Sequence, residues 1–397
     1  MDHVDNSSAI TTKESENHLE PEEHFLDGGF SAWATAFGGF LVQFCTYGWI
    51  GSVNAFLFEI CGLISGQLYD RGYVRQLVIG ASLLQAISLF MLSLAKPDQY
   101  YQVFLSQGIG SGCAGGLLYI PSMAVVSQYF CKRRALVMTF VASGACLGAV
   151  IHPIMLNNTI NGRLGFANGV RASAGLISGL LLIACFLIRP RLPPSKSSMN
   201  FLETANKCAR DRAYIFGTAG LTIFAVGFYY PLFYLQLDST MHGLSQTFSF
   251  YSVESNVSLR DDVLTLAARH HERIEFHRSA DEWILLFAFI ALRTLASVVA
   301  IGILYGYSAG IFQALWAPVL AVLSPDPSDL GTRMGISYAF MALGGLIGPP
   351  ISGALLTADY IWWRGAIFNG IMAAIGCLCF IAMQVVLRHR GRASANG

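Results

Sequence analysis

Charge is scarce in this chain of 397 residues. Only 12% of the residues are Asp, Glu, Lys or Arg, about half the share that a soluble globular domain carries, and the formal net charge is +1. No basic arm or stripe is present, which argues against nucleic acid as a partner. Hydrophobic residues make up 54% of the chain and lie in long runs. This composition predicts an all-α membrane protein that crosses the bilayer several times.

Motifs for metal binding and catalysis are also missing. The nine cysteines form no CxxC pair and mostly lie inside apolar runs, and "HHERIEFH" (270–277) has the wrong residue order for an HExxH zinc helix. No Ser/His/Asp set, phosphate-binding loop or pair of catalytic carboxylates stands in a loop. We therefore expect no enzyme, no cofactor and no metal. The acidic segment 1–26 has no basic region before an apolar core, so we expect a cytosolic tail rather than a cleaved signal peptide.

Apolar segments of about 20 residues or more predict membrane-spanning helices. Residues 30–69 form an apolar run about twice as long as one crossing, with no Lys, Arg, Pro or Asp inside it. One overlong helix, a tight hairpin, and a pair of helices with a segment missing between them are the alternatives. We favour a hairpin that turns at 48–52, because glycine accepts the backbone angles of a tight turn. The other predicted spans are 76–95, 101–126, 135–157, 170–188, 214–236, 296–323, 334–357 and 365–387.

The basic residues predict the orientation, because cytoplasmic loops hold an excess of Lys and Arg. Basic stretches lie at 70–75, 131–134, 189–196 and 388–392, and two predicted spans lie between each pair of neighbours among the first three. All four can therefore lie on the cytosolic face, together with both termini. The segment 253–283 carries too many charges to cross lipid. We expect ten full crossings, with the plasma membrane as the location.

Six spans precede a polar, proline-containing stretch, which predicts two bundles with a solute site between them. The predicted organisation is a polar tail (1–26), a six-helix bundle (27–188), a central cytoplasmic linker (189–212) and a C-terminal bundle (213–390) with a polar insert at 253–282. Glycines at four-residue spacing predict helix faces that pack closely. These sets are Gly108, Gly112 and Gly116, then Gly144 and Gly148, then Gly344 and Gly348.

Several segments resemble the monocarboxylate-porter family of the major facilitator superfamily, with the greatest similarity to its fungal branch. They include "DGGFSAW" (27–33), "GQLYDRGYVR" (66–75), "YFCKRRALVMTFVASGACLGAVIHPIML" (129–156) and "GTRMGISYAFMALGGLIGPPISGALL" (331–356). The resemblance covers most of 27–252 and 284–390. It implies a twelve-span parent that carries a small organic solute, such as a monocarboxylate, by alternating access in symport with protons.

The chain departs from this family in three places. Ala32 stands where the family usually has glycine, and the outer loop expected between "TYGW" and "WIGS" is absent. The polar segment 253–283 replaces spans eight and nine. The family's lysine late in span one and its Asp/Arg pair in span eight therefore have no counterpart here. The alternative function is a non-transporting remnant or a regulatory membrane protein derived from such a transporter.

The resemblance also implies a gate at the cytoplasmic side. Asp70 would cap the N-terminus of a neighbouring helix, while Arg71 and Arg75 would lock the inward gate. A second basic group of the same type is Lys132, Arg133 and Arg134. The positive-inside rule alone also accounts for these basic residues.

Polar residues inside spans are candidates for the solute or proton path. Glu59 is a carboxyl group in mid-span, and a locally paired or neutral residue is the alternative interpretation. His152 titrates near neutral pH when exposed, and a satisfied core histidine is its alternative. Arg171 is either a path residue or a snorkelling anchor. Hydrogen-bonding residues that could line the cavity are Asn54, Gln107, Tyr119, Gln313 and Asn369.

Overall fold

A computed structural model of the chain describes residues 28–46, 52–96, 99–130, 133–160, 164–191, 201–231, 316–324, 329–356 and 361–395, with a few single positions between these ranges. The secondary structure of these residues is entirely helical, in agreement with the all-α prediction. Helices are the expected element because a chain in lipid must satisfy its backbone hydrogen bonds within each segment.

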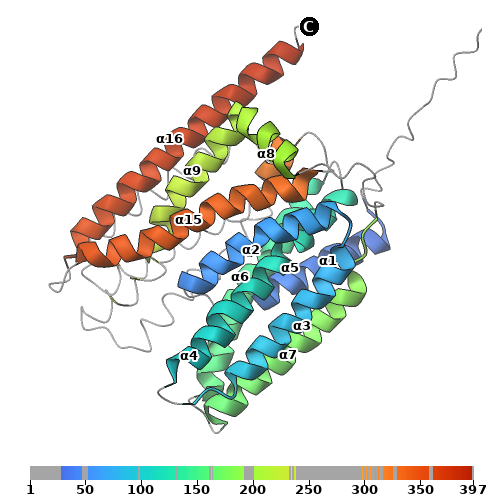
Figure 1. Cartoon of the computed structure of the whole chain (residues 1–397), viewed down its shortest axis with the longest axis vertical. Coiled ribbons are helices and arrows are strands. Elements are labelled where there is room, and N and C mark those ends of the chain that lie inside the picture. Colours follow the sequence, from blue (N-terminus) through green and yellow to red (C-terminus); the bar gives the residue numbers. More distant parts are fainter. Residues whose placement is uncertain are drawn as a thin grey trace, which may run out of the picture.

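The N-terminal helices pack together as one group, which we call the N-terminal bundle (Figure 1). The central helix α5 contacts α1, α2 and α3, while α7 packs on α1, α3 and α6. The bundle consists of α1 (Phe30–Thr46), α2 (Ser52–Asp70), α3 (Val74–Leu92), α4 (Tyr100–Val103), η1 (Phe104–Ser111), α5 (Gly112–Ala124), η2 (Val125–Gln128), α6 (Arg134–Ile160) and α7 (Gly165–Leu187).

Three long helices form a second group, the C-terminal bundle, in the part of the chain that the structure describes. They are α9 (Arg212–Phe228), α15 (Leu330–Leu356) and α16 (Trp362–Ala395), and α9 packs on both of the others. The most extensive contact between the two bundles is made by α2 and α15, which lie side by side (Figure 1). The short helix α8 (Phe201–Arg210) precedes α9 and packs on α9 and α15.

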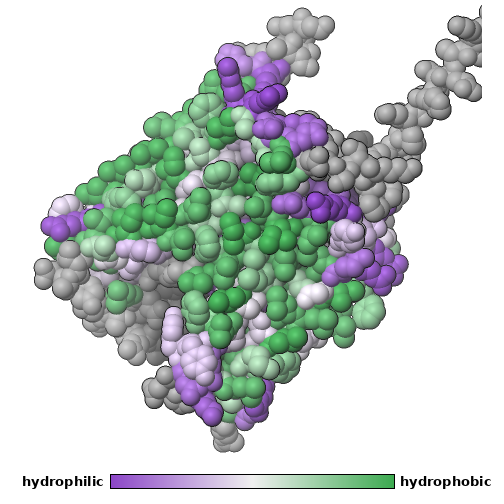
Figure 2. Space-filling view, viewed as in Figure 1, coloured by the Kyte–Doolittle hydropathy of each residue, from purple (hydrophilic) through white to green (hydrophobic). Residues whose placement is uncertain are grey.

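Six helices among the described residues are long and apolar enough to cross a membrane. Figure 2 shows apolar side chains across the middle of the molecule, with hydrophilic residues gathered toward the helix ends. This distribution is that of a protein whose outer surface faces lipid. The six segments are Val74–Leu92, Tyr100–Gln128, Leu136–Ile160, Gly165–Leu187, Leu330–Leu356 and Trp362–Arg390.

The run 30–69 contains two helices, α1 and α2, rather than one overlong helix. The two helices have 17 and 19 residues, close to the minimum for a crossing. The turn predicted at 48–52 lies outside the described residues except for Ser52, where α2 begins. The polar insert 253–282 and half of the span 296–323 also lie outside them.

Two elements differ from the predicted spans. The span 101–126 is interrupted by the π-helix η1, and a π-helical turn often marks a functional site. The central linker contains α8, which carries Glu203 and Lys207 as an exposed ion pair and buries Thr204 and Cys208. This linker is short of apolar residues, so hydropathy alone gave no reason to expect a helix there.

Glycines bring equivalent helices of the two bundles into the same contact. A Cβ atom at Gly144 or Gly148 of α6 would overlap the backbone carbonyl oxygen of Phe40 or Phe44 in α1. In the C-terminal bundle, a Cβ at Gly344 or Gly348 of α15 would overlap the carbonyl oxygen of Thr222 or Val226 in α9. The prediction of close helix contact at these four glycines is confirmed, and the matching geometry indicates that the bundles are internal structural repeats.

The third glycine set is only partly as predicted. Gly112 and Gly116 pack against Asn54 and Phe58 of α2, but a Cβ at Gly108 would meet only Phe104 of its own helix. Gly108 lies in the π-helix, whose wider turn rotates it away from the face that Gly112 and Gly116 share. The expectation that all three glycines share one helix face was therefore wrong for Gly108.

The start of α9 is fixed by its N-cap residue. Asp211 Oδ1 accepts hydrogen bonds from the backbone N–H of Ala213 (3.0 Å) and Tyr214 (3.3 Å), and Arg390 of α16 donates to the same oxygen at 2.6 Å. Partial burial raises the pKa of Asp211, but the hydrogen bond from Arg390 and those from the backbone outweigh it, so the net pKa is lowered. This contact ties the basic end of α16 to the linker.

We predict that Gly348→Ala destabilises the protein. The added methyl group would overlap the backbone of α9, and such overpacking costs about 1–3 kcal/mol. The measurement is the fraction of detergent-purified protein that stays monodisperse after heating. The control is Gly179→Ala in α7, whose Cβ would meet no atom within 4 Å. Equal thermal stability of the two variants would contradict the close packing of α15 on α9.

We also predict that Asp211→Ala lowers stability by about 0.5–2 kcal/mol, as loss of an N-cap does. The lowered pKa of Asp211 means that its contribution is present above the ordinary Asp pKa of about 4 and is lost as the pH falls below it. Thermal stability of wild type and variant, measured from neutral to acidic pH, should therefore converge at the acidic end. The control, Glu203→Ala, removes only an exposed i,i+4 pair worth about 0.5 kcal/mol or less.

Candidate functional site

The contact between α2 and α15 is the candidate functional site, because it joins the two bundles. The helices run antiparallel, with Gly66 against Gly331 and Gly62 against Gly335. A Cβ atom at Gly66 would overlap the carbonyl oxygen of Gly331, so the two backbones touch at this level. Three polar contacts between the bundles follow one another along this interface.

The first contact is made by Asp70 at the C-terminal end of α2. Its Oδ1 accepts a hydrogen bond from the backbone N–H of Gly331 (2.9 Å). Its Oδ2 accepts bonds from both the backbone N–H and the hydroxyl group of Thr332, each at 2.6 Å. The carboxylate thus satisfies two N–H groups in the first turn of α15 and faces the positive end of that helix dipole. The interaction spans 261 positions of sequence and joins the bundles at one end.

The second contact lies further along α2 and α15. The hydroxyl groups of Tyr119 in α5 and Tyr338 in α15 share a hydrogen bond of 3.0 Å, and their rings meet edge to face. Phe58 of α2 packs against the Tyr119 ring in the same manner. Both tyrosines are buried. Tyr119, predicted as a cavity residue, therefore lies at the boundary between the bundles.

The third contact involves Glu59 of α2. The hydroxyl group of Tyr229, the residue that follows α9, donates a hydrogen bond of 2.6 Å to Glu59 Oε1. The glutamate is only 6% exposed, and its Oε2 atom has no hydrogen-bond partner among the described residues. Tyr229 in turn lies against Gly345 of α15. Glu59 therefore reaches from the N-terminal bundle to the C-terminal one.

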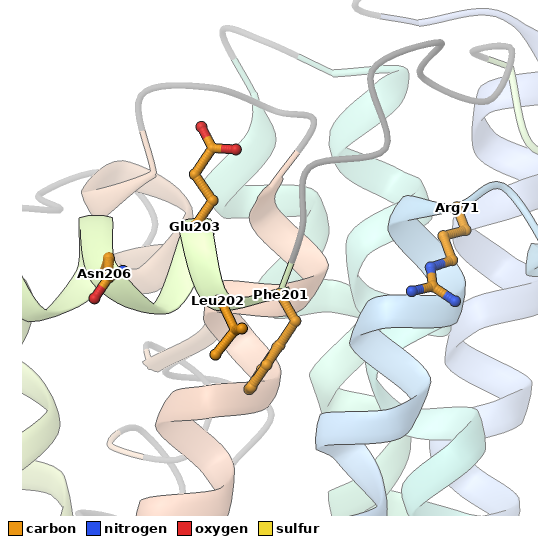
Figure 3. Close-up of a pocket in the computed structure, with 5 residues that line it drawn as sticks. All are labelled: Arg71, Phe201, Leu202, Glu203 and Asn206. Atoms are coloured by element: carbon orange, nitrogen blue, oxygen red, sulfur yellow. The ribbon is translucent and has the colours of Figure 1, made fainter.

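The predicted basic gate residues are distributed around the end of α2. Arg71 and Arg75 are exposed, as is Arg133, while Arg134 is half-buried and Lys132 lies outside the described residues. Arg71 borders a cavity of about 660 Å³ beneath α8, and Figure 3 shows its side chain extending toward this helix. The other lining residues are Phe201, Leu202, Glu203 and Asn206. This cavity lies between α2 and the linker helix.

Two predicted path residues make contacts within the N-terminal bundle. Asn54 Nδ2 donates to the carbonyl oxygen of Gln107 in the π-helix at 2.7 Å. His152 is 1% exposed, its Nε2 donates to the carbonyl oxygen of Phe44 at 3.2 Å, and its ring packs on the Phe44 ring. These contacts favour the interpretation of His152 as a core histidine between α6 and α1, although its Nδ1 atom is buried without a hydrogen-bond partner among the described residues.

Two more of the predicted residues lie away from the α2–α15 interface. Asn369 is fully buried between α16 and α15, where its Nδ2 donates to Ser352 Oγ (2.8 Å) and to the carbonyl oxygen of Gly365 (2.7 Å). Arg171 is exposed on α7 and its Nε lies 3.4 Å from Ser93 Oγ. The exposure of Arg171 favours its interpretation as a snorkelling anchor.

Sequence reasoning missed an ion pair that holds the N-terminus of α15. Arg333 Nε donates to Asp329 Oδ2 at 2.9 Å, and both side chains are buried. Arg333 Nη1 also bonds the carbonyl oxygen of Leu323, and Tyr214 of α9 bonds the carbonyl oxygen of Arg333. The signal was available, because two opposite charges four residues apart at the start of an apolar helix predict a pair.

The partners Tyr229 and Tyr338 were missed for another reason. Nothing in the sequence distinguishes them from the other aromatic residues of the spans. Their importance follows only from the tertiary contacts, since Tyr229 is 170 positions from Glu59 and Tyr338 is 219 positions from Tyr119.

The sequence is similar to a known protein family and to several of its members. The Major Facilitator Superfamily sequence profile matches residues 28–258. The aspyridones efflux protein of Emericella nidulans is 31% identical, over 97% of this chain and 85% of its own length. The fujikurins efflux protein of Gibberella fujikuroi is also 31% identical, over 96% of this chain and 89% of its own length. Both relatives are named as exporters.

Solved structures show the same fold at lower identity. The E. coli fucose:proton symporter aligns with a TM-score of 0.67 and 15% identity, over 89% of this chain and 96% of its own. The human organic anion transporter MFSD10 aligns with a TM-score of 0.66 and 18% identity, over 87% of this chain and 83% of its own. Together with the profile match over more than half of the residues, these similarities show that the chain belongs to the Major Facilitator Superfamily.

Proposed function

We propose that this protein moves a small organic solute, with a carboxylate or similar acidic group, across a cellular membrane by alternating access. The observation that carries the proposal is the Asp70 contact, in which one bundle caps the first turn of a helix in the other. Such a contact can break and reform as a unit when the bundles rock against each other. The two efflux proteins at 31% identity support a transport function.

The gate function proposed for Asp70 follows from its position. Closing this end of the interface requires α2 and α15 to approach until Gly66 touches Gly331, and the carboxylate then replaces water at two N–H groups. Charge-assisted bonds of this kind are stronger than neutral ones. We propose that this end faces the cytosol, because Arg71, Arg75 and Arg133 are exposed near it. Both termini are then cytosolic.

The acidic character of the solute is proposed from two sources. The motif resemblance of segments 66–75 and 129–156 is to porters of monocarboxylates, and a solved structure with the same fold is described as an organic anion transporter. A proton gradient is the proposed driving force, as in the fucose:proton symporter with this fold.

A non-transporting remnant is the second candidate. Its support is the direct fusion of "TYGW" and "WIGS" and the charged segment 253–283, which together suggest the loss of an outer loop and two spans. The alignment with the aspyridones efflux protein extends over 424 positions, more than the 397 residues of this chain, so that relative carries residues without a counterpart here. We propose that these departures weaken the seal around the cavity and reduce transport.

The experiment that separates the two candidates uses the full chain in proteoliposomes. Uptake of labelled pyruvate and benzoate is measured with and without an imposed pH gradient. Accumulation above that of empty liposomes supports a transporter, and stimulation by an inward proton gradient supports symport. No accumulation and no exchange of either solute, with protein that is folded by size-exclusion chromatography, favours the remnant.

We predict that Asp70→Asn slows transport by about tenfold. Asparagine keeps one acceptor oxygen but loses the charge that faces the α15 N-terminus, and a coupling of about 1–3 kcal/mol changes state populations by about 5–150-fold. The measurement is the initial rate of exchange at saturating solute. The control is Glu203→Gln, which removes a charge of the same type from an exposed i,i+4 pair. Wild-type rates in Asp70→Asn would exclude a gate at this contact.

A further inference from the structure

The carboxyl group of Glu59 is held at the midpoint of the interface between the bundles. Along α2 and α15, Gly66 lies at the level of Gly331 and Gly62 at that of Gly335, so the antiparallel register places Glu59 near Tyr338. The side chain is 6% exposed and points to Tyr229, whose ring lies against Gly345 of α15. Any movement that separates the bundles at this level must break the 2.6 Å hydrogen bond between Glu59 and Tyr229.

No positive charge of the described residues faces this carboxyl group. The helices packed against α2 are α3, α5 with η1, and α15, and Tyr229 follows α9. Arg75 is exposed in the first turn of α3, and Arg333 bonds Asp329 at the level of Gly66, about two turns from Glu59. Arg212 is exposed at the start of α9. The remaining titratable groups on these elements and on α2 are Cys61, Cys113, Tyr119, Tyr214, Tyr338, and Tyr69 and Asp70 at the far end.

An ionised carboxylate is costly in such a position. Its burial without a cation costs several kcal/mol, and the single hydrogen bond from Tyr229 offsets only part of that cost. The Oε2 atom, buried and without a hydrogen-bond partner among the described residues, is where a proton removes the charge. Oε1 then remains an acceptor for the Tyr229 hydroxyl group, so the observed geometry fits the neutral acid.

We propose that Glu59 is a proton-binding site whose occupancy is tied to contact between the two bundles. In the closed arrangement the neutral acid accepts the hydrogen bond of Tyr229. When the bundles separate, the bond breaks, water reaches the carboxyl group, and the O–H bond releases its proton to water and leaves a hydrated carboxylate. Closing again requires that a proton return first. The site thereby supplies this chain with a proton-linked step that needs no charged partner among the described residues.

The inference rests on the proposed transport function, so its first test is independent of any solute. Dicyclohexylcarbodiimide is an apolar reagent that adds to a protonated carboxyl group and leaves a stable N-acylurea. The full chain is treated at about pH 7, where an exposed glutamate is ionised, and its peptides are analysed by mass spectrometry. We expect the adduct on Glu59 and its disappearance at strongly alkaline pH. Absence of the adduct at about pH 7 overturns the proposal.

The second test measures transport with three proteins. Glu59→Gln keeps an acceptor for Tyr229 but binds no exchangeable proton, so pyruvate accumulation driven by a pH gradient should fall by about tenfold while pyruvate exchange at equal pH is largely kept. Tyr338→Phe is the matched control, because it removes the other hydroxyl bond between the bundles without removing a carboxyl group. It should lower both rates together and leave their ratio unchanged.

The outcomes separate the two proposals. A Glu59→Gln variant that keeps the wild-type ratio of driven uptake to exchange overturns the role of Glu59, whatever its absolute rate. If Glu59→Gln lowers driven uptake and exchange by the same factor, as Tyr338→Phe is expected to do, the proposal is also overturned. The hydrogen bond between Glu59 and Tyr229 would then be merely structural. If the wild type moves neither pyruvate nor benzoate, the acidic-solute proposal fails, and the carbodiimide result alone decides the proton site.

Discussion

Close backbone contact between α2 and α15 is the constraint on which the rest of this structure depends. At Gly62 and Gly66 the α2 backbone meets Gly335 and Gly331 with no side chain between them. Lipid offers no hydrophobic driving force for helix association, so such contacts rely on packing and on hydrogen bonds between helices. The short separation is what lets Asp70 reach backbone N–H groups and lets Glu59 reach Tyr229.

The three polar contacts along this interface differ in kind. Asp70 meets the N-terminus of α15 as a charge facing a dipole, Tyr119 and Tyr338 pair as neutral hydroxyls, and Glu59 meets a single phenol. A charge-assisted bond at one end and weaker neutral bonds further in would allow the interface to open stepwise. The buried pair Asp329 and Arg333 supports the first of these contacts, because it holds the first turn of α15 in place against the preceding segment.

The two bundles are built on matching helix contacts. The contact of α6 on α1 and the contact of α15 on α9 use glycine pairs four residues apart against the same type of backbone carbonyl. Each bundle is therefore closely packed where its own helices touch, and the proposed rocking movement would occur between the bundles. Polar residues that lie inside one bundle, such as His152 and Asn369, act as packing contacts there. Those between the bundles are the ones that a change of state can alter.

The sequence alone determined that the chain is helical and embedded in a membrane, because hydropathy, basic loops and glycine spacing are local patterns. The resemblance to transporters of this superfamily came from motifs such as 66–75 and 331–356. It also determined that 30–69 breaks into two helices and that Asp70 is a gate candidate. It could not show the π-helix that displaces Gly108, the helix within the linker, or the partners of Glu59 and Tyr119. Those features depend on contacts between residues up to 219 positions apart. Hydropathy gives the depth of a residue in the bilayer, but only the packing of helices decides which of its neighbours it faces.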